Sequence, residues 1–303
     1  WRASRCTVSG QKVRYLLHCF MASLNSMKSC SVSFPSLRSS PASVTALVRA
    51  CPLPKGRTAL RARADAAVEA PASARQSGMA LMLDDGTRKS HSMAENTAFV
   101  TGFFKGIATK SSFSNLVAGL YFVYKAMEES FDSTEDADVK ALDYNALRRL
   151  TALEQDMEYY FGADWRNTVH PSAATRKYVD RIKEVAATEP TLLIAHQYTR
   201  YLGDLFGGQM MGGMATRTLG LEEGKGISFY NFPDISDNKL FIEEWYSALN
   251  NIALTDEQKA AIVDEANLVF AYNIELFSEL DGNPIQSMFA LAWSTLKEKL
   301  GGQ

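Results

Sequence analysis

Apolar side chains recur every three or four positions along most of the chain beyond residue 79, which is the spacing of amphipathic helices. The pattern predicts helices over residues 113–131, 143–161, 174–187, 190–202, 238–252, 256–281 and 284–300. The segments between them are rich in Gly, Pro, Asn and Asp, which are turn residues. Only ISFYNF, at residues 227–232, has the pattern of a strand. We therefore expect residues 79–303 to form a single all-α, multi-helix domain.

Residues 1–78 lack this periodicity. They hold twelve of the 32 Lys and Arg residues but only two of the 34 acidic residues, so the remaining chain has a net charge of −12. A segment rich in Ser, Ala and Arg and poor in acids is typical of an organelle transit peptide. We predict a disordered plastid transit peptide beginning at Met21, with residues 1–20 upstream of the true start. Alternatively, YLLHCFMASL is the hydrophobic part of a signal peptide, or the segment is a functional basic arm.

Cysteine usage and hydropathy exclude several classes of protein for residues 79–303. The four cysteines all lie in the first 78 residues, at Cys6, Cys19, Cys30 and Cys51. The predicted domain therefore has neither disulfides nor a cysteine-based metal site. No window contains the 18 apolar residues needed to span a bilayer, so we expect a soluble protein of the plastid stroma. A domain this acidic is not expected to bind nucleic acid.

The stretch YLGDLFGGQMMGGMA, residues 201–215, holds five glycines within a region of helical pattern. Each glycine inside a helix costs roughly 1 kcal/mol relative to alanine. At 100° per residue one helix face would carry His196, Arg200, Gly203, Asp204, Gly207, Gly208 and Met211. Bare backbone there allows close approach of a neighbouring helix or of a flat, rigid ligand. The spacing alone favours neither, but the two charged residues on the face favour the ligand.

Residues 195–209, AHQYTRYLGDLFGGQ, resemble the signature of the heme oxygenase family. Further segments follow in the family's order, namely HSMAEN (91–96), KGIATKSSFSNLVAGLYFVYKAMEE (105–129), LEQDMEYYFGADW (153–165) and FAYNIELFSEL (270–280). The likeness covers about residues 85–281. It implies an all-α fold that holds heme between a proximal helix and the glycine-rich distal helix. It also implies cleavage of heme by O₂ to biliverdin, CO and ferrous iron, with heme as both substrate and prosthetic group.

The resemblance implies specific roles for individual residues. By position, His91 is the proximal iron ligand. The residues expected to contact heme are Thr87, Glu95, Phe103, Tyr178, Tyr198, Gly203, Gly207, Gly208 and Phe270. The residues expected to serve catalysis are Asp204, Arg200, Tyr124 and Asn273.

The residues themselves support part of this assignment. Glu95 lies one helical turn after His91, so its carboxylate can orient the imidazole. A carboxylate at Asp204 can hold water beside the pocket and deliver protons. Asn273 lies on an apolar helix stripe, where a buried amide needs partners. His196 is interpreted as a hydrogen-bonded structural residue. For each polar residue the alternative is a satisfied group of the core.

Several positions depart from the family pattern. Where Lys or Arg is expected to meet the heme propionates, this chain has Asp84, Ile242 and Tyr246. The remaining candidate cations are Arg88, Lys89 and Lys239. Glu243 and Glu244 are expected to make the local field more negative, which puts the regiospecificity of cleavage in doubt. Phe206, Gly212 and Gly213 also depart from the pattern, and we expect altered specificity there.

The resemblance further implies that ferredoxin donates the electrons and that a bilin reductase uses the product. Ferredoxin is itself acidic, so docking requires a local basic patch. The candidate patch comprises Arg176, Lys177, Arg181 and Lys183. Two other hypotheses remain: a non-catalytic heme- or bilin-binding protein on the same fold, and a helical interaction protein without a ligand.

Overall fold

The computed structural model describes residues 73–280, and within them the regular structure is entirely helical. The longer helices are α2 (Gly78–Glu95), α3 (Ala98–Phe104), α4 (Lys110–Ser133), α6 (Leu150–Phe161), α8 (Ala173–Thr188), α11 (Gly208–Thr218), α12 (Asn238–Asn250) and α13 (Asp256–Leu280). The shorter elements are η2 (Ala74–Gln76), α5 (Ala137–Ala141), η3 (Asn145–Leu147), α7 (Trp165–Thr168), η4 (Pro190–Leu192), α9 (Leu193–Gln197), η5 (Tyr198–Leu202), α10 (Gly203–Phe206) and η6 (Ser228–Tyr230). The all-α prediction is confirmed.

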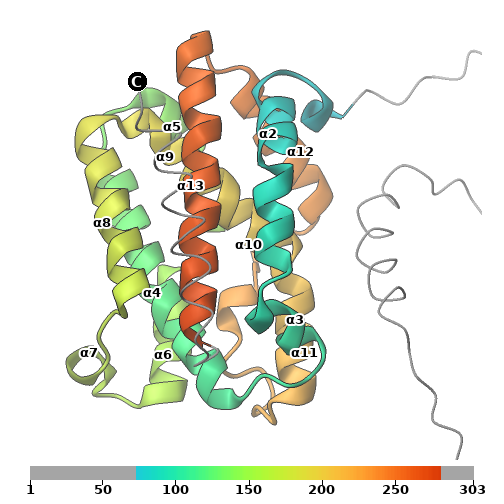
Figure 1. Ribbon diagram of the computed structural model, residues 1–303, viewed down its shortest axis with the longest axis vertical. Coiled ribbons are helices and arrows are strands. Elements are labelled where there is room, and N and C mark those ends of the chain that lie inside the picture. Colours follow the sequence, from blue (N-terminus) through green and yellow to red (C-terminus); the bar gives the residue numbers. More distant parts are fainter. Residues whose placement is uncertain (1–72, 281–303) are drawn as a thin grey trace, which may run out of the picture. The chain divides into compact units, whose positions relative to one another are not determined.

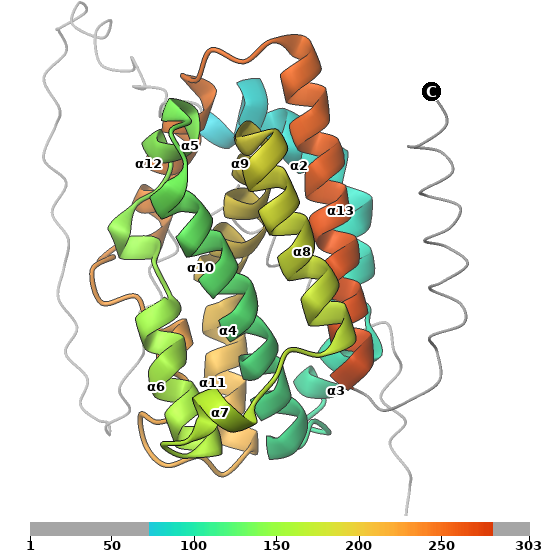
Figure 2. The ribbon, with the colours of Figure 1, turned by 90° about the vertical axis from the view of Figure 1, so that its left-hand side faces the viewer.

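Helix α13 lies in front in the view of Figure 1, between α8 and α2, and at the edge of the helices in the turned view of Figure 2. It packs against α2 on one side and α8 on the other, and also contacts α3, α4 and α9. Helix α4 in turn packs against α6 and α8, as the turned view in Figure 2 shows. The apolar stripes predicted from the sequence face this common core, where Phe113, Tyr124, Tyr178 and Ile262 are fully buried.

Most predicted helix ends agree with the structure because the capping residues are local. Thr109 and Ser112 form a reciprocal capping box at the start of α4. Ser172 caps α8 by accepting from the Thr175 amide, and Asp237 caps α12. The helix predicted over residues 284–300 lies outside the described residues.

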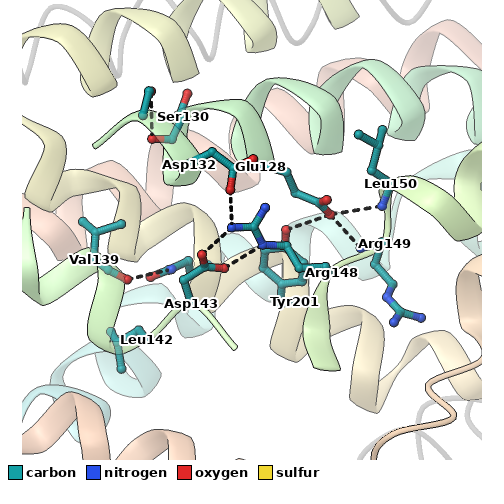
Figure 3. Close-up of polar contacts among 12 residues, drawn as sticks. Glu128, Ser130, Asp132, Val139, Leu142, Asp143, Arg148, Arg149, Leu150 and Tyr201 are labelled. Carbon is teal, nitrogen blue, oxygen red and sulfur yellow. Dashed lines mark hydrogen bonds and ion pairs between the residues drawn. The ribbon is translucent and has the colours of Figure 1, made fainter. Parts of the chain in front are cut away.

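The helix predicted over residues 143–161 is wrong in its first turns, because α6 begins only at Leu150. Glu128 of α4 accepts hydrogen bonds from the backbone amides of Arg149 (2.6 Å) and Leu150 (3.1 Å), as Figure 3 shows. These are the free amides of a helix start, so Glu128 caps α6 from another helix. Arg148 meanwhile turns back to Asp143, and its side chain also pairs with Asp132.

The strand predicted over residues 227–232 is also wrong. The segment forms the short turn η6, whose residues Phe229 and Tyr230 are buried. Asp156 of α6 accepts hydrogen bonds from the Ser228 and Phe229 amides, both at 2.8 Å. The apolar character of the segment therefore reflects burial of its rings and not pairing with another strand.

The predicted division of the chain between residues 78 and 79 stays a prediction. The described helices begin at Ala74, ahead of that position. Among residues 73–280 no helix is both long and apolar enough to cross a membrane.

Candidate functional site

Helix α2 places Asp84, Thr87 and His91 on one face, at intervals of three and four residues. The Nδ1 atom of His91 lies 3.6 Å from a carboxylate oxygen of Glu95, and about two fifths of each side chain is exposed. Phe270 of α13 meets the imidazole edge-on, with 5.5 Å between ring centroids. Glu95 lies close enough to Nδ1 to help orient the imidazole, and a nearby carboxylate is the usual companion of a ligating histidine.

The distal side is a single helical run from Leu193 to Thr218, interrupted by the π-helical turn η5 at Tyr198–Leu202. Such π turns occur frequently at functional sites. A Cβ atom added to Gly203 would meet nothing within 4 Å, and on Gly207 it would meet only the Gly203 carbonyl oxygen. We call the bare backbone of these two glycines the cradle. A side chain at Gly203 would fill the open space in front of this backbone.

The neighbouring glycines serve another purpose. A Cβ atom on Gly208 would lie 2.9 Å from the Tyr230 ring, and one on Gly212 would lie 3.0 Å from the Tyr230 side chain. Their missing side chains therefore make room for Tyr230 of η6. Gly213 has open space around it. Of the three glycines expected to contact heme, Gly203 and Gly207 face open space and Gly208 faces this tyrosine.

Asp204 lies beside the cradle in a buried polar network. Arg200 donates to both carboxylate oxygens of Asp204, at 3.0 and 2.7 Å, and the Tyr124 hydroxyl donates to one of them. Arg200 also donates to the Asn273 side-chain oxygen at 2.6 Å. The Asn273 amide donates to the Val269 carbonyl at 2.8 Å. The four residues expected to serve catalysis are thus brought together from three helical segments.

The electrostatics of this network follow from its burial. Burial raises the pKa of Asp204, and this effect exceeds the opposing influence of the Arg200 charge and of the hydrogen bond from Tyr124. Burial and the nearby Asp204 charge raise the pKa of Tyr124 well above its usual value. Tyr124 therefore remains a proton donor at neutral pH. Asp204 is held by donors, yet its affinity for a proton is increased.

A second buried cluster lies behind Arg200. His196 is fully buried, and its Nε2 atom lies 3.1 Å from Glu265, which also accepts from Arg181 at 3.1 and 2.6 Å. The ring of Tyr178 stacks on His196, with 5.8 Å between centroids. The hydrogen bond expected for His196 is therefore present. Sequence reasoning did not identify Glu265 as its partner, because nothing in the local pattern connects α13 with α9.

The remaining predicted heme contacts differ in their surroundings. Thr87 is buried and donates to the Leu83 carbonyl at 2.7 Å. Burial raises the pKa of Tyr198, and a hydrogen bond with Thr87 opposes this rise, so the two side chains join α2 to the distal helix. Phe103 is fully buried and packs on Phe99 and Phe113 in an aromatic cluster. Phe206 is half-buried against the core.

Two of the four residues in the predicted basic patch are already paired. Lys177 binds Glu275, and Arg181 binds Glu265. Arg176 and Lys183 are exposed and line a groove of about 600 Å³ between α4, α6 and α8, which also contains Lys125 and Arg166. Among the described residues no carboxylate forms an ion pair with Arg176 or Lys183. The groove carries acidic side chains as well, at Glu129, Glu154 and Asp180.

Comparison with known proteins decides the family. Residues 77–279 match the family model described as heme oxygenase. The chain belongs to the heme oxygenase family. A heme oxygenase 1 of Nostoc sp. is 45% identical over 224 residues, which are 74% of this chain and 94% of that protein. The heme oxygenase of the red alga Porphyra purpurea is 43% identical over 73% of this chain and 94% of its own length.

Solved structures agree with this assignment. Heme oxygenase-1 from Synechocystis sp., determined in complex with heme, superposes with a TM-score of 0.66 at 45% identity. The alignment covers 73% of this chain and all of that structure. A heme oxygenase from Leptospira interrogans superposes with a TM-score of 0.65 at 40% identity, over 67% of this chain and all of its own. This heme oxygenase therefore shares its helical arrangement with family members of known structure.

Proposed function

We propose that this heme oxygenase cleaves heme with O₂ to biliverdin, CO and ferrous iron, for the synthesis of bilin pigments. The observation that carries the proposal is the combination of a bare backbone at Gly203 and Gly207 with a largely buried, donor-bound carboxylate at Asp204. A non-catalytic heme-binding protein requires the open backbone but has no use for the carboxylate network.

The residues of α2 fit a planar tetrapyrrole. His91 would hold the iron through its imidazole, and Glu95, 3.6 Å from Nδ1, would help to orient the ring. Phe270 contacts the imidazole at its edge, and no side chain lies within 4 Å of the place that a Cβ atom of Gly203 or Gly207 would take, so the backbone leaves room for a flat ligand there. Bound heme supplies the redox-active iron and the porphyrin carbon that is oxidised.

Asp204 controls protons at the distal side. Its carboxylate is anchored by Arg200 and Tyr124, so it can hold a water molecule in a fixed orientation toward the cradle. Burial raises the pKa of Asp204, which increases its affinity for a proton and suits a role in proton transfer. Asn273 fixes Arg200, which keeps the carboxylate in place through the reaction.

We further propose that reduced ferredoxin supplies the electrons and that the enzyme acts in the plastid stroma. The predicted transit peptide supports the location. Arg176 and Lys183 provide unpaired positive charge for an acidic donor. A bilin reductase is the expected consumer of the product.

The test combines the purified protein with hemin, ferredoxin, its reductase, NADPH, O₂ and an iron chelator, while the absorbance spectrum is followed. We expect a Soret band that decays as biliverdin absorbance rises. A stable Soret band that never decays would refute catalysis and support a heme- or bilin-binding protein. Absence of any Soret band would exclude heme as a ligand and leave a helical interaction protein.

A further inference from the structure

The segment that precedes α2 is fastened to α12. The Ser73 hydroxyl donates to Glu243, and the Ala74 amide donates to the same carboxylate at 2.8 Å. Asn250 donates to the Ala74 carbonyl at 2.7 Å and accepts from the Ala80 amide at 2.9 Å. Glu243 was expected to add negative charge near the propionates. Its carboxylate also holds the chain ahead of α2.

Gly78 sets the direction in which this segment enters α2. Its φ of 55° lies in the left-handed region, and a Cβ atom there would lie 2.7 Å from the Asn250 side-chain oxygen. Only glycine meets both conditions without strain. The turn η2 is therefore held by backbone geometry as well as by hydrogen bonds. The side chain between these fixed points is Arg75.

Arg75 reaches over the N-terminal half of α2. Its Nη2 atom donates to Asp84, two turns before His91 on the same helix face, and about a quarter of its side chain is exposed. Burial alone would lower the pKa of Arg75, but the hydrogen bond to Asp84 and the nearby Tyr246 and Tyr198 raise it. Arg75 therefore lies near Asp84 and Tyr246, two of the positions where a Lys or Arg was expected to bind the propionates.

The guanidinium retains capacity for a second carboxylate. A guanidinium has five N–H donors in a planar fork, and the hydrogen bond to Asp84 starts from Nη2 alone. The ion pair with Asp84 fixes the position of the planar guanidinium, just as a second hydrogen-bond partner orients a side chain that binds a ligand. Arg75 can therefore bind an anionic ligand without breaking its ion pair.

The two ends of α2 differ in polarity, which orients an amphipathic ligand. Heme carries two propionate carboxylates on one edge and hydrocarbon on the others. The segment with Arg75, whose guanidinium is near Tyr198, precedes the N-terminal end of α2. Helix α3, which carries the stacked rings of Phe99 and Phe103, follows the C-terminal end (Figure 1). Burying a carboxylate among aromatic rings is costly, so the propionate edge faces Arg75.

We infer that Arg75 binds a heme propionate and thereby fixes which edge of the porphyrin faces the cradle. Arg75, in the segment ahead of α2, thus replaces the Lys or Arg residues that are missing from α2 and α12. The other candidates are less suited. Arg88 is 72% exposed and pairs with Asp85 and, at 4.0 Å, with Asp84, and Lys89 and Lys239 are exposed. This inference rests on the proposed function, because it requires heme as the ligand.

The test compares hemin with hemin dimethyl ester, whose propionates carry no charge. Both are titrated into the full-length protein and followed by the Soret band. We expect Arg75→Gln to weaken hemin binding about five- to tenfold, as loss of a partly exposed charge-assisted pair does. Its affinity for the dimethyl ester should equal that of the unchanged protein. Lys140→Gln, which removes a surface cation paired with Glu135 on α5, is the control and should leave both affinities unchanged, and Arg88→Gln tests the competing cation.

A second readout is the distribution of biliverdin isomers, which should broaden in Arg75→Gln and recover in part in Arg75→Lys. Thermal melts of each variant verify folding. Equal loss of affinity for hemin and for the ester would overturn the inference, because the effect would then not involve the propionates. A loss seen in Arg88→Gln instead of Arg75→Gln would do the same. If the unchanged protein binds neither compound, the proposed function fails along with the inference.

Discussion

The carboxylate of Asp204 is held firmly in place and also has an increased affinity for a proton. Arg200 and Tyr124 donate to its carboxylate, which holds the charge in a buried place. Burial nevertheless raises its pKa above the usual value of an aspartate. A group that is firmly positioned and yet receptive to a proton suits general acid–base work. An exposed aspartate on the same helix would have neither property.

We predict that Asp204→Asn keeps the Soret band with hemin but lowers the rate of biliverdin formation by about 10²- to 10⁴-fold, the usual contribution of a positioned proton donor. The substitution also leaves Arg200 buried without its anion, so the free energy of unfolding should fall by about 3 kcal/mol or more. Single-turnover absorbance and urea denaturation measure the two effects. Asp234→Asn, on an exposed loop residue, is the control. Turnover at the normal rate in Asp204→Asn would contradict the assignment.

His91 is the second residue whose role can be tested alone. We predict that His91→Ala shifts or weakens the Soret band, because the iron loses its only proposed protein ligand. Added imidazole should restore the band, since the removed ring leaves space beside Phe270. His170→Ala, in a loop before Pro171, serves as control. An unchanged spectrum in His91→Ala would show that another group holds the iron.

Glu265 provides a prediction about pH. Burial alone would raise its pKa, but the hydrogen bonds and charges of His196 and Arg181 lower it to about 2. A carboxyl whose pKa is lower in the folded than in the unfolded protein stabilises the fold above its unfolded value of 4.5. That stabilisation, on the order of 3 kcal/mol, is lost as the pH falls from about 5 toward 2.

We therefore expect Glu265→Gln to reduce the free energy of unfolding at pH 7 and to reduce it much less at pH 3. Urea denaturation at both pH values measures the difference. Glu275→Gln, whose carboxylate pairs with Lys177 at the surface, is the control and should change little at either pH. An effect of Glu265→Gln that is the same at pH 7 and pH 3 would be inconsistent with the lowered pKa.

At the scale of an element, the glycines of the distal helix differ in what lies opposite them. Gly208 and Gly212 accommodate Tyr230, whereas a Cβ atom on Gly203 or Gly213 would meet nothing within 4 Å. The proposed role of Gly203 in binding heme therefore rests on its place beside Asp204 and not on its open surroundings alone. Composition alone cannot separate these uses, because each depends on what lies opposite the missing side chain.

Three alanine substitutions should separate them. Gly213→Ala should raise the free energy of unfolding by up to about 1 kcal/mol through helix propensity and leave hemin affinity unchanged. Gly203→Ala should not destabilise the protein but should weaken hemin binding. Gly212→Ala should lower stability, because its Cβ atom would lie 3.0 Å from Tyr230. Thermal melts and Soret titrations provide the measurements. Normal hemin affinity in Gly203→Ala would show that the cradle does not hold heme.

At the scale of the whole molecule, residues 79–303 carry a net charge of −12, which repels an acidic electron donor. Local positive charge must therefore direct docking. Arg176 and Lys183 lie on one groove without carboxylate partners among the described residues, whereas Lys177 and Arg181 are neutralised.

We expect Lys183→Glu to raise the KM for reduced ferredoxin several-fold at low ionic strength, with less effect at high salt. Lys239→Glu produces the same change in net charge on α12, away from the groove, and should have little effect. Initial rates at two salt concentrations measure both. A larger effect from Lys239→Glu would place the docking surface elsewhere.

Much of this protein follows from its sequence alone. The 3.6-residue periodicity predicted α8, α12 and α13 to within two residues at each end, and α4 to within three. The run from His196 to Gly208 is by itself typical of the heme oxygenase family. Signals of this kind are local, since a helix start or a glycine motif is encoded within a few neighbouring residues.

Only the tertiary structure decided the rest, because it depends on contacts between distant segments. Glu128 sets the start of α6 from another helix, and Tyr230 explains Gly212 from a turn that the sequence suggested to be a strand. Arg75 lies in a stretch that composition assigns to targeting, yet α12 fixes it above α2. Caps, cavities and ion pairs that join residues far apart in sequence leave no periodicity to detect, so they are fixed only when the chain packs.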